Sequence, residues 1–125
     1  MAKKKIGILT GGGDCPGLNP AIRGCVLAAM KRGYECLGFL EGWKGIIENK
    51  TRVLTVEDVD EIISRGGTIL GTSRTNPYKR EGGVEKARET FKKNGLEALV
   101  AMGGEDTLGV AMRLHKDFKF PVVGV

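Results

Sequence analysis

Short apolar runs alternate with longer amphipathic stretches along this chain. The run at 6–10 (Ile-Gly-Ile-Leu-Thr) predicts a strand buried on both faces, because no polar residue alternates with the apolar ones. Runs at 36–40, 99–102 and 121–125 predict three more strands, of which 99–102 is expected to be buried.

The stretches between these runs repeat apolar residues at helical spacing. Asn19 and Pro20 suit the N-cap and the first position of a helix. Thr55 is expected to cap a second helix, and Gly95 to follow the end of a third, near 84–93. The apolar positions are Ile22, Cys25, Val26, Ala29 and Met30 in the first helix, Val56, Val59, Ile62 and Ile63 in the second, and Leu108, Ala111 and Met112 in a fourth, which begins near Thr107.

Alternating strands and helices indicate an α/β fold. We expect a single domain over 1–125, with a three-layer, doubly wound, mostly parallel sheet that is covered by helices on both faces. Ligands of such sheets bind beyond the carboxyl ends of the strands. The sequence stops inside an apolar run at Val125, so we expect these residues to be the N-terminal part of a longer protein.

Charge and composition argue against several classes of partner. The net charge is +5, but aromatic residues are only 6%, the basic residues are interspersed with acids, and no nucleic-acid-binding motif appears. No apolar run reaches the ~18–20 residues that cross a bilayer, and no signal peptide begins the chain. Three cysteines without metal-ligand spacing predict reduced, structural thiols. We expect a cytoplasmic protein that binds neither nucleic acid nor membrane.

Glycine is enriched and clustered where the predicted strands end. It makes up 20 of 125 residues, more than twice the usual ~7%. The loop Thr10-Gly-Gly-Gly-Asp-Cys-Pro-Gly-Leu-Asn19 follows the first strand and opens a helix, which suits phosphate binding by backbone N–H groups. It is neither a Walker A loop nor the dinucleotide G-x-G-x-x-G motif, and a simple tight turn is the alternative.

A second loop, Gly103-Gly-Glu-Asp-Thr107, also follows a strand and opens a helix. It adds two neighbouring carboxylates, Glu105 and Asp106, of the kind that bind Mg²⁺ in phosphoryl transfer. The alternative is that both acids only interact favourably with the helix dipole. A third segment, Gly66-Gly-Thr-Ile-Leu-Gly-Thr-Ser-Arg74, ends in hydroxyls and a guanidinium suited to phosphate oxygens.

Together, in this order and spacing, the three segments resemble the 6-phosphofructokinases over nearly the whole chain. The resemblance implies Mg²⁺-dependent transfer of a phosphoryl group to the 1-hydroxyl of fructose 6-phosphate, and it assigns Glu105 to the metal. It implies that Gly13 contacts the donor phosphates and that Arg74 reaches the donor side. The full set of expected donor-phosphate residues is Gly12, Gly13, Arg74, Gly104 and Thr107.

The donor is inferred from Asp106. ATP-using relatives usually carry glycine there, whereas a carboxylate is expected in the pyrophosphate-using branch, so the resemblance favours pyrophosphate. The carboxylate would fill space used by the α-phosphate of a nucleotide, and two unit charges ~4 Å apart repel by about 4 kcal/mol at an effective dielectric of 20. Trp43 matches an aromatic near the adenine in ATP-using relatives, although a packed aromatic is the alternative.

The resemblance places the general base in a segment that follows Val125. Residues 1–125 alone are therefore expected to be inactive, and the full-length two-domain enzyme is expected to be a homo-oligomer that binds fructose 6-phosphate. The alternatives are an ATP-dependent phosphofructokinase, another kinase with a Gly-Gly-Asp-Gly loop, or a non-catalytic phosphate-binding subunit. His115 is expected to be packed or partly exposed rather than catalytic.

Overall fold

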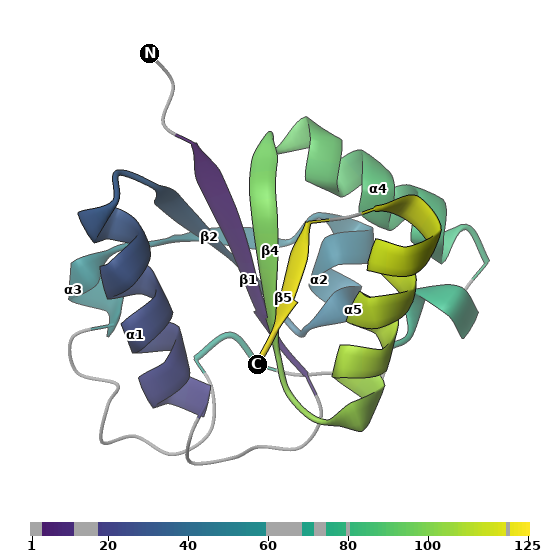
Figure 1. Cartoon of the computed structure of the whole chain (residues 1–125), viewed down its shortest axis with the longest axis horizontal. Coiled ribbons are helices and arrows are strands. Elements are labelled where there is room, and N and C mark those ends of the chain that lie inside the picture. The colour runs from purple at the N-terminus through teal and green to yellow at the C-terminus, as the bar shows by residue number, and fades with distance from the viewer. Residues whose placement is uncertain (1–3, 12–17, 60–68, 72–74, 80, 120) are drawn as a thin grey trace.

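Five strands form one sheet in the order β3-β2-β1-β4-β5 in the computed structural model, which describes residues 4–11, 18–59, 69–71, 75–79, 81–119 and 121–125 (Figure 1). The strands are β1 (Lys5–Thr10), β2 (Glu35–Phe39), β3 (Thr51–Leu54), β4 (Leu96–Met102) and β5 (Val122–Gly124). The helices are α1 (Leu18–Lys31), α2 (Trp43–Glu48), α3 (Val56–Val59), α4 (Gly83–Lys93) and α5 (Glu105–Phe118), with a 3-10 turn η1 (Pro77–Lys79).

The sheet is mostly parallel and doubly wound, as the sequence predicts. β1 pairs in parallel with both β2 and β4, and β5 pairs in parallel with β4. Only β3 runs antiparallel, on the edge beside β2. No apolar run predicts β3, because three of its four residues are exposed.

Two hydrophobic cores cover the two faces of the sheet (Figure 1). Side chains alternate along β1, so Ile8 packs with α1 and α3 while Leu9 packs with α2, α4 and α5. The same alternation holds in β4, where Val100 and Leu99 belong to opposite cores. The helix after β1 and the helix after β4 therefore lie on opposite faces.

The start of one helix and the end of another agree with the predictions. The Asp58 carboxylate accepts hydrogen bonds from the Thr55 backbone N–H and hydroxyl, and the Thr55 hydroxyl accepts one from the Asp58 N–H. The hydrogen bonds to Thr55 lower the pKa of the Asp58 carboxyl, and Arg52 adds to this effect. Gly95 follows α4 with a φ of 64°, as a residue after a helix end should. The predicted continuation to Ile62 and Ile63 lies outside the described residues.

Several details of the helices differ from the predictions. The sequence pattern does not predict α2, and Met30, placed on the apolar side of α1, is 39% exposed. Asn19 is not an N-cap: α1 begins at Leu18, and the Asn19 side chain is buried within the first turn. Met112 is 70% exposed, because the buried side of α5 follows the helical repeat through Thr107, Val110, Ala111 and Leu114.

Within the ranges that the structure describes, no helix is long and apolar enough to cross a membrane.

The thiols of Cys25 and Cys36 are free, as predicted, and Cys15 lies outside the described residues. Burial raises the pKa of the Cys36 thiol to about 11, and burial also raises the pKa of Cys25. A thiol with a pKa near 11 is only about 0.1% thiolate at pH 8, so it reacts slowly with electrophiles.

We predict that Cys36 in the native protein reacts with iodoacetamide at pH 8 roughly a hundredfold more slowly than in urea, because unfolding restores an ordinary thiol pKa. Mass spectrometry of the labelled peptide measures both rates. Equal rates in the two states would show that the thiol is accessible and unperturbed.

Candidate active site

The site predicted from the glycine loops lies where the winding of the sheet reverses. β1 lies between β2 and β4. After β1 the chain continues to β2 and β3 on one side of the sheet, and after β4 it continues to β5 on the other side. Thr10 pairs with Met102 at the carboxyl ends, and the Gly11 N–H donates to the Met102 carbonyl at 2.8 Å. Such switch points are the usual ligand sites of open α/β sheets.

At this point the two loops touch through residues that lack a Cβ atom. A Cβ on Gly103 would collide with the backbone carbonyl of Gly11, and a Cβ on Gly11 would collide with the Thr107 side chain. Thr107 is only 4% exposed, in the first turn of α5. The expectation that the two glycine loops meet at one edge of the sheet is thus met at Gly11, Gly103 and Thr107.

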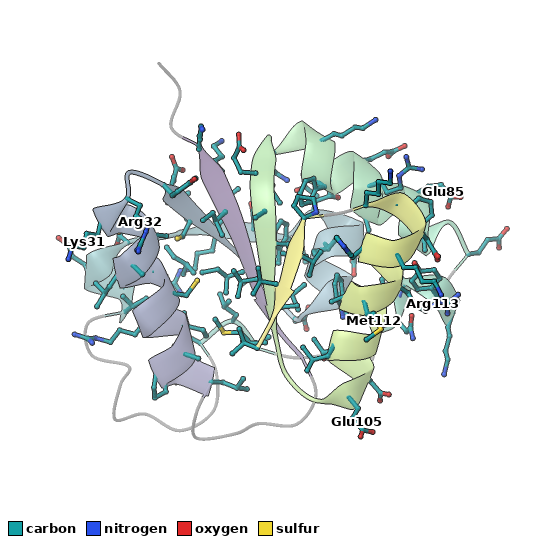
Figure 2. The ribbon with its side chains drawn as sticks, in the orientation of Figure 1. Lys31, Arg32, Glu85, Glu105, Met112 and Arg113 are labelled. Carbon is teal, nitrogen blue, oxygen red and sulfur yellow. The ribbon has the colours of Figure 1, made fainter. Side chains whose placement is uncertain are left out.

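The N-terminus of α5 opens directly at this edge. Its N-cap, Gly104, is extended (φ −86°, ψ −164°) and has no side chain that could cap the helix, and a helix start of this kind suits an anion. Glu105 and Asp106 are exposed in the same turn, and Figure 2 shows Glu105 at the end of α5 near the carboxyl ends of the strands. Backbone donors and two carboxylates therefore share one helix end.

The third predicted segment reaches the same edge through Gly71. The Thr10 hydroxyl donates to the Gly71 carbonyl at 2.9 Å, although 61 positions separate the two residues. Gly71 has a φ of 75°, a left-handed conformation that favours glycine. The sequence does not predict this role of the Thr10 side chain, because no local pattern indicates a partner so distant in sequence. Three predicted donor residues, Gly12, Gly13 and Arg74, lie outside the described residues.

The described acids fit a magnesium site completed by substrate. In the described ranges no three His, Cys, Asp or Glu residues gather into a group that could hold a metal by itself. Mg²⁺ does not need such a cage when phosphates are present, because it takes one or two carboxylates together with water and phosphate oxygens. Glu105 and Asp106 place two carboxylates in the first turn of α5.

The remaining candidates lie away from this edge or face solvent. Trp43 is 3% exposed and packs in the same core as Phe39 and Ile46. This agrees with the alternative that Trp43 is a packed aromatic residue. His115 is exposed near the far end of α5, in agreement with the expectation of a packed or partly exposed histidine.

The sequence profile described as Phosphofructokinase matches residues 5–125. The chain belongs to the phosphofructokinase family. Phosphofructokinases are phosphotransferases, kinases of glycolysis. The resemblance inferred from the three glycine-rich segments is thereby confirmed.

Curated relatives in this family include users of either phosphoryl donor. The chain is 55% identical over its whole length to a pyrophosphate–fructose 6-phosphate 1-phosphotransferase of Dictyoglomus thermophilum, and 56% identical over 97% of its length to one of Amycolatopsis methanolica. An ATP-dependent 6-phosphofructokinase 3 of Streptomyces coelicolor is 48% identical over 97% of this chain. The chain spans 36% of the length of each of these relatives.

Solved phosphofructokinase structures share the fold described above. The Pichia pastoris phosphofructokinase in the T-state superposes with a TM-score of 0.93 and 31% identity, over 100% of this chain and 15% of that one. The Saccharomyces cerevisiae phosphofructokinase gives a TM-score of 0.83 at 28% identity, over 98% of this chain and 20% of that one. The predicted fold class is therefore confirmed.

We predict that Gly103→Ala lowers the free energy of unfolding by about 1–3 kcal/mol, because the new Cβ must displace the Gly11 backbone. Urea unfolding measures the change. Gly109→Ala is the matched control: it lies in α5 with open space around it, so it should be neutral or stabilising by up to ~1 kcal/mol. Equal effects of the two substitutions would contradict the close contact of the loops.

Proposed function

We propose that this chain forms the donor-phosphate and Mg²⁺ half of the active site of a longer, pyrophosphate-dependent 6-phosphofructokinase. That enzyme transfers a phosphoryl group from pyrophosphate to the 1-hydroxyl of fructose 6-phosphate and gives fructose 1,6-bisphosphate. The observation that carries the proposal is the helix end at the switch point, where Glu105 and Asp106 stand beside uncapped backbone N–H groups. The pyrophosphate-using relatives at 55% and 56% identity support it.

Each described residue at this edge has a role in the proposal. The N–H groups after Gly104 bind donor phosphate oxygens together with Thr107, whose side chain also packs against Gly11. Glu105 holds Mg²⁺. The bound ion supplies positive charge that screens the phosphate oxygens during transfer. Gly12, Gly13 and Arg74 complete the donor side by the family resemblance.

Asp106 sets the donor in this proposal. Its carboxylate is exposed at the start of α5, next to the position proposed for the donor phosphates. A negative charge there repels the additional phosphate of a nucleotide but leaves room for the compact pyrophosphate. The ATP-dependent relative at 48% identity makes ATP the second candidate donor, and an assay with each donor separates the two.

For the metal, we predict that Glu105→Gln in the full-length enzyme lowers kcat by about tenfold or more, because a neutral amide holds Mg²⁺ poorly. Turnover is measured across a Mg²⁺ titration. Glu85→Gln is the control, since Glu85 is also an exposed acid in the first turn of a helix, α4. Similar activity of both variants at limiting Mg²⁺ would mean that Glu105 only complements the helix dipole.

For the donor, we predict that the wild-type enzyme uses pyrophosphate and hardly any ATP, and that Asp106→Gly weakens pyrophosphate use while improving ATP use. Relief of ~2–4 kcal/mol of repulsion corresponds to roughly a 30- to 1000-fold gain with ATP. A coupled assay of fructose 1,6-bisphosphate with each donor measures both.

Asp106→Asn serves as the matched variant for this test, because it removes the charge and keeps the size of the side chain. A gain with glycine but not with asparagine assigns the effect to space, and equal gains assign it to charge. A wild-type enzyme that prefers ATP would overturn the donor assignment.

A further inference from the structure

Three consecutive residues, Ile69–Gly71, are hydrogen-bonded to three different elements. The Ile69 N–H donates to the Asn19 side-chain oxygen in α1 at 2.8 Å. The Leu70 carbonyl accepts from the Glu41 N–H, which follows β2, at 2.9 Å. The Gly71 carbonyl accepts from the Thr10 hydroxyl at the end of β1, also at 2.9 Å. The segment is thus tied across the carboxyl ends of β1 and β2.

Apolar packing supports the same placement. Leu70 is 2% exposed and belongs to the core between α1 and the sheet. It lies over Gly38 near the carboxyl end of β2, where an added Cβ would come within 2.5 Å of the Leu70 side chain. The absence of a Cβ on Gly38 therefore makes room for Leu70, which anchors the segment between its two polar ends.

The two polar anchors are the first and last residues of the first glycine motif. Thr10 is 0% exposed and Asn19 is 1% exposed, so both are buried polar side chains. Buried polar groups are costly unless they are hydrogen-bonded, and removing one partner typically costs about 1–3 kcal/mol. The two end residues of the first glycine-rich segment therefore both form hydrogen bonds with the third glycine-rich segment.

We propose that Thr10 and Asn19 are positioning residues for the phosphoryl donor. They hold Ile69–Gly71 at the carboxyl end of β1, and Arg74 follows Gly71 by three positions in the sequence. This inference rests on the proposed function, in which Arg74 serves the donor. Neither side chain takes part in the chemistry; both act through the segment that they hold.

The test uses isosteric substitutions in the full-length enzyme. Thr10→Val removes the hydroxyl donor, and Asn19→Leu removes the oxygen that accepts from Ile69. We expect each to raise the KM for pyrophosphate by about three- to tenfold, as the loss of one positioning hydrogen bond would. The KM for fructose 6-phosphate should stay unchanged, and Thr10→Ser, which keeps the hydroxyl, should restore the donor KM.

Thr90→Val is the matched control. Thr90 is also a buried threonine, 4% exposed, but it lies in α4. It should alter stability without changing the KM for pyrophosphate. A Thr10→Val enzyme that loses stability but keeps the wild-type donor KM would show a purely structural role and overturn the proposal. Thr10→Val also tests the proposal by itself if Asn19→Leu fails to fold.

Amide hydrogen exchange gives a second readout that does not depend on turnover. The Glu41 N–H bonds to Leu70, and neither substitution removes an atom of that bond. If Thr10 holds the segment, Thr10→Val should speed exchange at the Glu41 N–H, whereas Thr90→Val should not. Unchanged exchange at the Glu41 N–H in Thr10→Val would contradict the proposal that Thr10 holds Ile69–Gly71 in place.

The outcomes separate this inference from the proposed function. If the wild type uses ATP, the donor assignment fails, and a raised KM for ATP in Thr10→Val still supports the positioning role. If the wild type transfers phosphate from neither donor to fructose 6-phosphate, both the proposed function and the positioning role are overturned.

Discussion

The contact between Gly11, Gly103 and Thr107 is the constraint on which the arrangement of the candidate site depends. Two adjacent parallel strands lie only ~4.8 Å apart, so the loops that leave their ends compete for the same space. One loop leads to α1 and the other to α5, on opposite faces of the sheet. Because neither glycine carries a Cβ, both loops start from the same place, and the N-terminus of α5 lies directly against the end of β1.

The charges at this edge are of both signs, and that combination limits which ligands fit. The helix dipole and the first-turn N–H groups, which Gly104 cannot cap with a side chain, favour an anion at the start of α5. Glu105 and Asp106 in the same turn would repel that anion unless a cation lies between them. A phosphorylated ligand together with Mg²⁺ meets both demands, whereas a phosphate alone meets only the first. The site therefore suits a metal-bound phosphate better than simple anion storage.

Buried polar side chains determine where the third glycine-rich segment lies. Apolar packing of Leu70 favours burial but does not choose a direction along the strand ends. The hydrogen bonds to Thr10 and Asn19 do choose one, because each requires a particular backbone group at about 2.9 Å. Burial of both polar side chains makes alternative positions costly, since each would break a hydrogen bond of a buried side chain. Residues 69–71 are thereby held in one position next to the proposed donor side.

The sequence alone determined the fold class, the strands β1, β2, β4 and β5, the helices that follow β1, β3 and β4 together with α4, and the family, because apolar runs and glycine clusters are local signals. It did not determine the edge strand β3 or the short helix α2. It also indicated the helix that carries Glu105 and Asp106 and the cap formed by Thr55. Only the tertiary structure decided that Asn19 serves Ile69 rather than a helix cap, that Thr10 binds Gly71, and that Met112 faces solvent. Each of these depends on a partner 50 or more positions away or on which side of a helix meets the sheet, and no local pattern records either.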